Sequence, residues 1–412
     1  MNIMYVTTSL RAPNGVCAVN VIESLIKSGH NVTVFTQRNE NEVKCPCEII
    51  YSKYKNIYTK KEHFKKRAHS KIARNIADFL YRIWNVLCYP IWPINSPYFI
   101  KAFTKEANGI AKKRNVDVVV TEYGDIACLS AGRLIKKKNK QIKAIAYFVD
   151  ALFCGAKPSL MPEKMKNKKS LKWENKLLRD YDKVIMMEAT RKRYFEVKNI
   201  INYYNKITFL DIPMLKINSV EHNKNESKQK GVVNFAYIGS MPRNIRNPHY
   251  IFEMFKKINN KDWHLYVYGS NDYINMMSTY RDYNVEYLGI VSHEDSLKIM
   301  SKADILINIG NSISEMVPSK IFEYMSMGKP IVSTFKVLDD SCIKYLQYYK
   351  NALCLNENAE LLDSCNQLDE FVKNQTNEKD EIINLKSLTS KDGSLYKNTP
   401  KAFVDCMEDM HA

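Results

Sequence analysis

The chain has 412 residues, of which 45% are hydrophobic and 26% charged, a balance typical of a globular protein rather than a disordered or fibrous one. One hydrophobic core rarely extends over such a length, so two domains are expected. No run of about 18 apolar residues is available to span a bilayer, which favours a soluble protein. The formal net charge of +18 is explained either by a solvated basic surface or by an anionic partner, such as a nucleic acid, a lipid surface or a charged substrate.

The first half of the chain alternates strand-like and helix-like segments. Residues 2–8 predict a buried strand and not a signal peptide, because no basic residue precedes them and no small-residue cleavage site follows. Residues 16–28 have helical periodicity and residues 31–36 predict a second strand, so a parallel βαβ unit is expected. Further strands are predicted at residues 117–121, 143–148, 183–187 and 207–212. This alternation predicts a doubly wound α/β domain over residues 1–217.

A basic, aromatic insertion at about residues 53–114 interrupts that alternation. It contains fifteen Lys and Arg against three acidic residues, together with Trp84, Tyr89 and Trp92. A helix is predicted over residues 71–87, and the prolines that follow would end it. Two interpretations stay open: a solvated helical face over a packed aromatic core, or a patch that attracts an anionic membrane surface.

The second half repeats the alternation after a polar stretch. Residues 218–231 are predicted to be an interdomain linker, and residues 232–372 a second doubly wound domain. Its predicted strands end in Gly239, Gly269 and Gly289, at the sheet edge where open α/β folds bind ligands. For Gly269 and Gly289 an ordinary turn is the favoured interpretation. The tail, residues 373–412, is predicted to form helices that pack back on the N-terminal domain.

A more specific pattern lies at residues 315–332. A predicted strand, residues 304–309, leads through a loop into a helix, and Pro318 stands where proline favours a first helical turn. Ser319 and Lys320 then present backbone N–H groups, a hydroxyl and an ammonium at the positive end of that helix, as a diphosphate requires. Glu323 lies one turn further, within reach of a ribose diol, and Glu315 on the loop could reach sugar hydroxyls.

This segment resembles the E-x7-E element of GT-B-fold retaining glycosyltransferases, in the large bacterial group that builds capsules, exopolysaccharides and lipopolysaccharide. Glu315 and Glu323 are eight residues apart, as that element requires. The strand ending in Gly239, followed by Arg243 and Arg246, is also similar to the family. The resemblance implies a GT-B fold: two Rossmann-like doubly wound domains that face each other across a cleft.

The resemblance also implies roles for these residues. Glu323 is expected to bind the ribose, and Ser319 and Lys320, after Pro318, the diphosphate. Glu315 is expected to contact the donor sugar, and Arg243 or Arg246, near Gly239, to neutralise the leaving nucleoside diphosphate, where charge accumulates in the transition state.

The N-terminal domain supplies weaker candidates. Asn14 and Gly15 are predicted to form a loop between the first strand and its helix, where backbone would approach a phosphate or the acceptor; many relatives carry two adjacent glycines there. Asp150, at the end of a predicted strand, occupies a region where relatives place a His or Asp near the reaction centre, and an ordinary cap is the alternative. Glu122 and Asp125 are lesser candidates of the same kind.

No metal and no cofactor are expected. The ten cysteines lack a zinc-site spacing, and the short Cys45–Cys47 separation gives poor geometry for zinc, so they are interpreted as reduced cytosolic thiols. The one candidate for a metal-binding Asp-x-Asp motif, Asp180 to Asp182, falls in a turn whose charges are better explained by solvent exposure.

The sequence therefore predicts an enzyme that moves a sugar from a nucleotide-sugar donor to a glycan or lipid-linked acceptor, in cell-surface polysaccharide synthesis. It is expected to be cytoplasmic, and peripheral on the inner face of the cytoplasmic membrane if the insertion at residues 53–114 is a membrane-surface patch. The first alternative is a nucleotide-sugar 2-epimerase of the same fold. A basic nucleic-acid-binding protein is a further alternative, but no recognition motif accompanies the charge and no nucleic-acid partner is expected.

Overall fold

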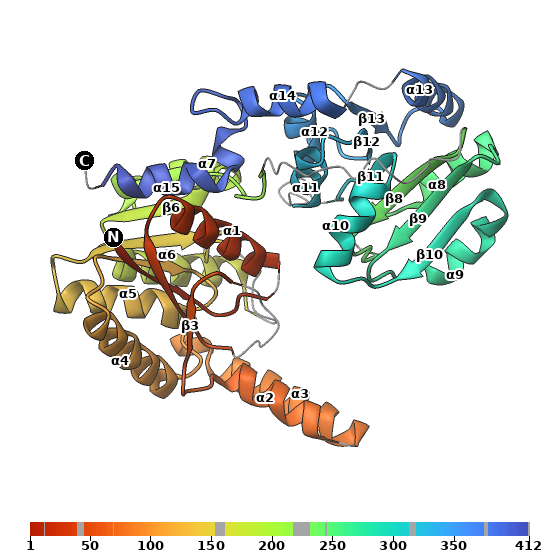
Figure 1. The fold of residues 1–412 in the computed structure, drawn as a ribbon. Coiled ribbons are helices and arrows are strands. Elements are labelled where there is room, and N and C mark those ends of the chain that lie inside the picture. Colours follow the sequence, from red (N-terminus) through yellow and green to blue (C-terminus); the bar gives the residue numbers. More distant parts are fainter. Residues whose placement is uncertain are drawn as a thin grey trace. The chain divides into compact units, whose positions relative to one another are not determined.

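The computed structural model describes residues 1–11, 13–38, 45–68, 70–152, 161–216, 231–243, 245–312, 319–374 and 378–410. The chain forms two compact units, one of Met1–Pro213 with Pro400–Ala412 and the other of Met214–Thr399 (Figure 1). The predicted linker at residues 218–231 falls almost wholly outside the described residues.

The first unit is built on a seven-stranded sheet with the order β3-β2-β1-β4-β5-β6-β7, in which every neighbouring pair is parallel. The strands are β1 (Asn2–Thr7), β2 (Asn31–Thr36), β3 (Glu48–Tyr51), β4 (Val118–Glu122), β5 (Lys143–Phe148), β6 (Lys183–Met187) and β7 (Ile207–Leu210). All five residues of β4 are buried, as expected of a central strand covered on both faces.

Helices cover both faces of this sheet. The helices of this unit are α1 (Pro13–Lys27), α2 (Ile57–Arg67), α3 (Lys71–Leu87), α4 (Pro97–Lys113), α5 (Ile126–Lys138), α6 (Glu163–Leu178), α7 (Arg191–Glu196) and α15 (Pro400–Glu408), with short 3-10 turns at Tyr89–Ile91, Glu188–Thr190 and Tyr204–Lys206. Of these, α2 and α3 contain no buried residue, so they are not part of that cover. Helix α4 packs on α5, and α1 packs on α15 (Figure 1). Side chains alternate across a strand, so Met4 and Val6 join the core under α4 and α5 while Tyr5 points to the other face.

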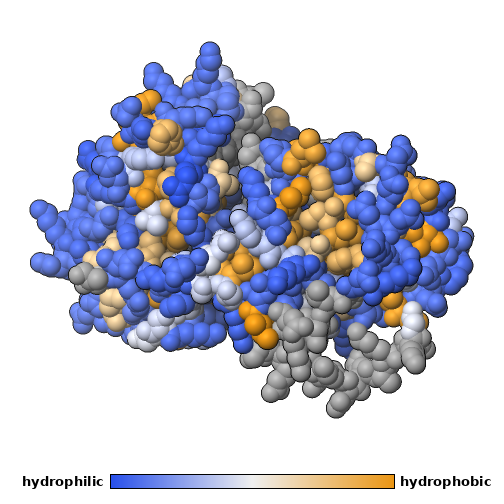
Figure 2. Space-filling model, turned by 90° about the horizontal axis from the view of Figure 1, so that it is seen from above, coloured by the Kyte–Doolittle hydropathy of each residue, from blue (hydrophilic) through white to orange (hydrophobic). Residues whose placement is uncertain are grey.

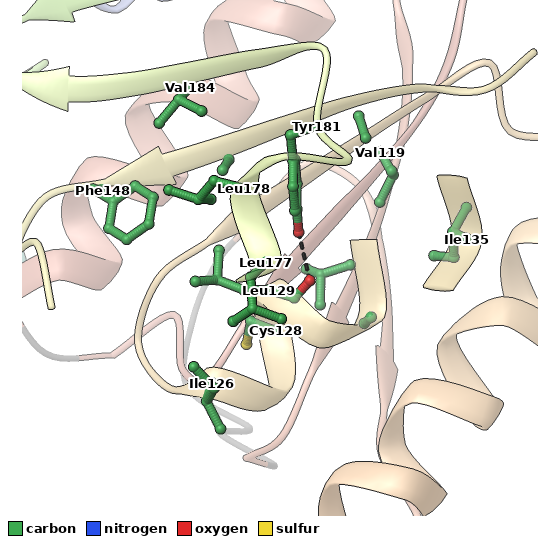
Figure 3. Close-up of a cluster of buried hydrophobic side chains, with 14 of the residues drawn as sticks. Val119, Ile126, Cys128, Leu129, Ile135, Phe148, Leu177, Leu178, Tyr181 and Val184 are labelled. Atoms are coloured by element: carbon green, nitrogen blue, oxygen red, sulfur yellow. Dashed lines mark hydrogen bonds between the residues drawn. The ribbon is translucent and has the colours of Figure 1, made fainter. Parts of the chain in front are cut away.

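Figure 3 shows part of that core, in which Cys128 and Leu129 of α5, Leu177 and Leu178 of α6, and Tyr181 belong to one cluster of buried side chains. The Tyr181 hydroxyl donates to the Leu129 carbonyl oxygen at 2.7 Å, which satisfies a polar group that is otherwise fully buried. Tyr181 is therefore a core residue.

The second unit contains a six-stranded parallel sheet with the order β10-β9-β8-β11-β12-β13. Its strands are β8 (Val233–Ile238), β9 (Trp263–Tyr268), β10 (Val285–Gly289), β11 (Ile305–Ile309), β12 (Ile331–Phe335) and β13 (Ala352–Asn356). Its helices are α8 (His249–Ile258), α9 (Ile274–Met277), α10 (His293–Lys302), α11 (Lys320–Ser326), α12 (Ser341–Leu346), α13 (Leu361–Lys373) and α14 (Glu378–Leu388), with 3-10 turns at Ser278–Tyr283 and Tyr396–Asn398. The strand order reverses between β8 and β11, and such a switch point is where doubly wound folds bind ligands.

Two doubly wound sheets agree with the predicted fold class. The predicted tail is divided, because α14 belongs to the second unit and α15 to the first. Within the described ranges no helix is both long and apolar enough to cross a membrane. The face drawn in Figure 2 is mostly hydrophilic, with separate hydrophobic patches.

Candidate functional site

The carboxyl edge of the second sheet is tied together by glycine backbone. Gly239, after β8, donates to the Tyr268 carbonyl oxygen at 2.9 Å, and Gly269 donates to the Gly289 carbonyl oxygen at 2.8 Å. Gly269 has a φ of 117°, and a Cβ there would lie 2.0 Å from the Gly239 carbonyl oxygen. No other residue type fits at Gly269, so its presence is explained by close packing of two loops.

Arg246 is fixed at this edge between the ends of β8 and β11. Its Nε donates to the Asn311 side-chain oxygen at 2.8 Å, and its Nη1 donates to the Ser240 carbonyl oxygen at 2.8 Å and to the Tyr237 hydroxyl at 3.2 Å. All three acceptors are uncharged, so they hold the guanidinium in place without neutralising it. A fixed cation of this kind is suited to an anionic ligand.

Arg243 has different partners, although it lies only three residues earlier. Its backbone N–H donates to the Asp272 carboxylate at 3.0 Å, and its Nη2 donates to the Asp272 carbonyl oxygen at 3.2 Å. Its guanidinium lies 5.8 Å from the centre of the Tyr273 ring. Of the two arginines predicted for the phosphate, Arg246 contacts the ends of β8 and β11, and Arg243 contacts the loop after β9.

Helix α11 presents the described part of the predicted donor segment. Ser319 is its N-cap residue, and the Lys320 ammonium donates to the Glu323 carboxylate at 2.7 Å. The Glu323 side chain is only 11% exposed and that of Lys320 27%, so the pair is partly shielded from water. Lys320 and Glu323 were predicted to bind the diphosphate and the ribose, and in this structure they bind each other.

Tyr324 attaches this helix to the end of β8. Its hydroxyl accepts from the Ile238 N–H at 3.1 Å and donates to the Ile238 carbonyl oxygen at 3.2 Å, in a fully buried position. Tyr324 follows Glu323 and Ile238 precedes Gly239, so these two bonds bring the first turn of α11 next to the predicted Gly239 site.

Glu315 and Pro318 lie outside the described residues, so their places relative to Glu323 stay predictions. The structure adds residues that the sequence did not single out. Asp340 is 2% exposed and accepts from the backbone N–H groups of Asn311 at 3.2 Å and Cys342 at 2.7 Å. A Cβ at Gly310 would lie 2.6 Å from the same carboxylate, which explains a glycine directly after β11.

In the first unit, the segment predicted as a loop at Asn14 and Gly15 is the first turn of α1, so that prediction is wrong. The physical reason is Pro13, which stands at the first helical position, where its missing N–H costs nothing. A Cβ at Gly15 would lie 2.2 Å from the Leu10 backbone. The small size of Gly15 therefore serves contact within the chain.

Three acidic residues lie at the ends of neighbouring strands of the first sheet: Glu122 is the last residue of β4, Asp125 follows β4, and Asp150 follows β5. Glu122 is buried, accepts from the Tyr5 hydroxyl at 3.3 Å, and has its pKa raised to about 7 by loss of hydration and by the negative charge of Asp150. Asp125 is the N-cap of α5 and accepts from the Ala127 N–H at 2.8 Å. Asp150 is exposed, two residues after β5.

The acidic turn before β6 has a structural role. Asp180 pairs with Arg133 at 2.5 Å, and Asp182 pairs with Lys136 at 2.9 Å while accepting from the Ala144 N–H at 2.7 Å. The Cys45 and Cys47 sulfurs lie 3.2 Å apart. In the part of the chain that the structure describes, no three His, Cys, Asp or Glu side chains are grouped as a metal site would need.

Residues 233–368, about a third of the chain, match the sequence model of the family described as Glycosyl transferases group 1. No curated protein matches the sequence. Solved structures share the fold over nearly the whole chain. Anabaena Alr3699/HepE in complex with UDP has a TM-score of 0.60 at 10% identity, over 99% of this chain and 100% of that one.

Two further structures have similar folds. The lipopolysaccharide outer core galactosyltransferase WaaB, in its apo form, has a TM-score of 0.55 at 14% identity over all of both chains. A putative UDP-N-acetylglucosamine 2-epimerase from Listeria monocytogenes has a TM-score of 0.54 at 10% identity, over 100% of this chain and 96% of that one. These structures confirm the predicted pair of doubly wound α/β domains and their GT-B-like fold, and the family match at residues 233–368 confirms the resemblance to glycosyltransferases. Every described residue predicted to bind the donor lies within the matched segment.

Proposed function

We propose that this glycosyltransferase of GT-B fold moves a sugar from a nucleotide-sugar donor to a glycan or lipid-linked acceptor. The observation that carries the proposal is that the end of β8 holds both the fixed guanidinium of Arg246 and, through Tyr324, the helix with the shielded Lys320–Glu323 pair. Both lie within the segment that matches group 1 glycosyltransferases. Donor binding at this edge agrees with the switch point between β8 and β11.

In this proposal Arg246 and Lys320 stabilise the diphosphate as it leaves. The bond between the anomeric carbon and the phosphate oxygen breaks, so negative charge grows on the diphosphate, and cations already held in place lower the cost of that change. Lys320 must then share its ammonium between Glu323 and the phosphate. Ser319 adds a hydroxyl, and the backbone near Gly239 lets the diphosphate approach closely. Arg243 supports this edge of the sheet by contacting the loop after β9.

Glu323 would accept hydrogen bonds from the ribose diol through its carboxylate. The Lys320 ammonium already donates to one oxygen of this carboxylate at 2.7 Å. A carboxylate with two oxygens can accept from the ammonium and from a hydroxyl together. Glu315 is assigned to the donor sugar and Pro318 to the start of the phosphate loop, on the resemblance alone.

The proposal also includes the stereochemistry of transfer, its independence of a metal and the kind of polysaccharide that is made. Transfer with retention of anomeric configuration and without a metal follows from the resemblance, with Asp150 facing the reaction centre and Asn14 and Gly15 near the acceptor or phosphate. A role in capsule, exopolysaccharide or lipopolysaccharide synthesis is supported by the similar fold of the WaaB galactosyltransferase. HepE was solved with UDP, which supports a nucleotide-sugar donor here.

A nucleotide-sugar 2-epimerase is the second candidate, because a putative epimerase has the same fold. The two functions differ in their products. A transferase joins the sugar to an acceptor and releases a nucleoside diphosphate, whereas an epimerase needs no acceptor and yields an epimerised sugar.

The test is to incubate the purified protein with a panel of nucleotide sugars, with and without glycan and lipid-linked acceptors. We expect one donor to release nucleoside diphosphate, faster with an acceptor, and Glu323→Gln to reduce its kcat/KM by about 10- to 100-fold, as for loss of a charge-assisted hydrogen bond worth about 1.5–3 kcal/mol. Glu286→Gln, an exposed change in the same sheet, is the matched control. Epimerised sugar formed without an acceptor would support the second candidate instead.

A further inference from the structure

Helices α2 and α3 form a hairpin that projects from the first unit (Figure 1). None of the residues of α2 or α3 is buried. Ile72, Phe79 and Leu87 are 71%, 61% and 69% exposed. A helix in a globular protein normally buries its apolar face, so the exposure of these side chains is unusual.

The exposed apolar side chains of α3 share one face. Helical spacing places Ile72, Ile76, Phe79 and Ile83 in line, with Leu80 and Leu87 beside them. All six are exposed, and we call them the α3 apolar face. The face runs the whole length of the helix, so it is far larger than an isolated surface leucine.

Helix α3 contacts α2 through its other, polar side. Asp78 pairs with Lys61 at 3.1 Å and with Lys65 at 2.6 Å. The rings of Tyr58 and Tyr81 lie 6.0 Å apart, and the Lys61 ammonium is within 5 Å of both ring centres. The hairpin is thus held together by polar and aromatic contacts, and it turns its apolar face outward.

The hairpin that carries this face is also strongly basic. Residues 53–87 contain ten Lys and Arg but only two acidic residues, Glu62 and Asp78. Those two acids pair with Lys61 and Lys65. Six further cations are exposed on the hairpin: Lys60, Lys66, Arg67, Lys71, Arg74 and Arg82. The hairpin therefore combines an apolar stripe with an excess of positive charge.

We propose that the α2–α3 hairpin docks on an anionic membrane surface, with α3 lying in the plane of the interface. The α3 apolar face would enter the boundary between headgroups and acyl chains, and the excess positive charge of the hairpin would attract the anionic headgroups. A second copy of the chain fits less well, because a symmetric contact would bring two strongly basic patches together.

Membrane docking deepens the proposed function by giving the enzyme access to a lipid-linked acceptor. It uses no residue of the donor site and needs no nucleotide. Vesicle binding measured without a donor therefore tests the docking proposal alone, and its result does not depend on whether the protein transfers a sugar.

The test is co-sedimentation of the full-length protein with phosphatidylcholine vesicles, with and without phosphatidylglycerol. We expect binding to the anionic vesicles and little binding to phosphatidylcholine alone. Two triple variants are then tested. The first removes the apolar face by combining Ile76→Ser, Phe79→Ser and Ile83→Ser. The second reverses the charge of the hairpin by combining Lys60→Glu, Lys66→Glu and Arg67→Glu. Each should lower partitioning by about tenfold or more, since one basic residue near the surface is worth about a factor of five.

Matched controls change the same chemistry elsewhere. The first control makes the same charge change at exposed positions of α6, by combining Lys164→Glu, Lys168→Glu and Lys172→Glu. The second control removes exposed apolar side chains of the second unit, by combining Leu338→Ser and Ile383→Ser. Both controls should bind vesicles like the unchanged protein. All substituted side chains are exposed, so circular dichroism should be unchanged.

Three results would overturn the proposal. The first is no binding to anionic vesicles, and the second is equal binding by the unchanged protein and both hairpin variants. The third is an apolar-face variant that loses self-association in analytical ultracentrifugation but keeps vesicle binding, which would make the face a contact between copies of this chain.

Discussion

Replacing Tyr324 by phenylalanine tests how α11 is held against β8. The change removes one hydroxyl and leaves the Ile238 N–H and carbonyl oxygen without that partner in a buried strand. A buried polar group left unpaired costs about 1–3 kcal/mol, so the loss should be about 2 kcal/mol or more. For a unit of this size, each kcal/mol lowers the melting temperature by about 2–4 °C, giving a fall of about 4–8 °C.

Differential scanning calorimetry of the full-length protein measures that fall, and titration calorimetry measures nucleoside diphosphate binding by the same variant. Binding should weaken, because Lys320 and Glu323 lose their anchor to the end of β8. Tyr348→Phe, at a residue 40% exposed, is the matched control and should change neither quantity. An unchanged melting temperature for Tyr324→Phe would refute the view that these two hydrogen bonds fix α11.

Two further predictions concern backbone and charge. Gly269→Ala should destabilise the protein by more than about 2 kcal/mol in urea unfolding, because its φ of 117° and the 2.0 Å approach of the Gly239 oxygen both exclude a side chain. Gly109→Ala, within α4 and with nothing near the added Cβ, should instead stabilise by about 0.5–1 kcal/mol, and equal effects of the two changes would contradict this reasoning. The pKa of Glu122 is raised to about 7, above its usual 4.5, so the folded state binds more protons and stability should fall by a few kcal/mol as pH rises from about 4.5 to 7. Thermal melts across this range should show a smaller fall for Glu122→Gln, and an identical pH profile would show that this carboxyl is not the cause.

Most strands of both sheets could be predicted from the sequence because they are continuous β-branched or apolar runs. The two strands that the sequence did not predict are the edge strands β3 and β13. Residues 48–51 are only four long and none is buried, so no strong apolar run marks them. Residues 352–356 contain no β-branched residue, and their pairing with β12 comes from tertiary context.

The donor segment could be predicted in part because its signal is local. Lys320 and Glu323 are three residues apart on one helix, and their spacing alone brings them together. Asn311 and Asp340 could not be found in this way, because they meet only when β11 and β12 lie side by side. The first turn of α1 could have been predicted, since Pro13 marks a helix start.

The hairpin illustrates a different limit. Periodicity predicted a helix at residues 71–87, and α3 spans the same residues. A period identifies an apolar face but not what covers it, because that depends on which side α2 occupies. The pairing of Asp78 with Lys61 and Lys65 determines which face of α3 is covered, because it places α2 on the polar side.

Glu323 is proposed to hold the ribose of the donor, and a binding cycle isolates that contact. Titration calorimetry would compare a nucleoside diphosphate with its 2′-deoxy form, for the unchanged protein and for Glu323→Ala, with Glu286→Ala as control. The unchanged protein and the control should favour the ribose form by about tenfold, as for one charge-assisted hydrogen bond, and Glu323→Ala should bind both forms equally. An undiminished preference for the ribose form in Glu323→Ala would contradict the proposed contact.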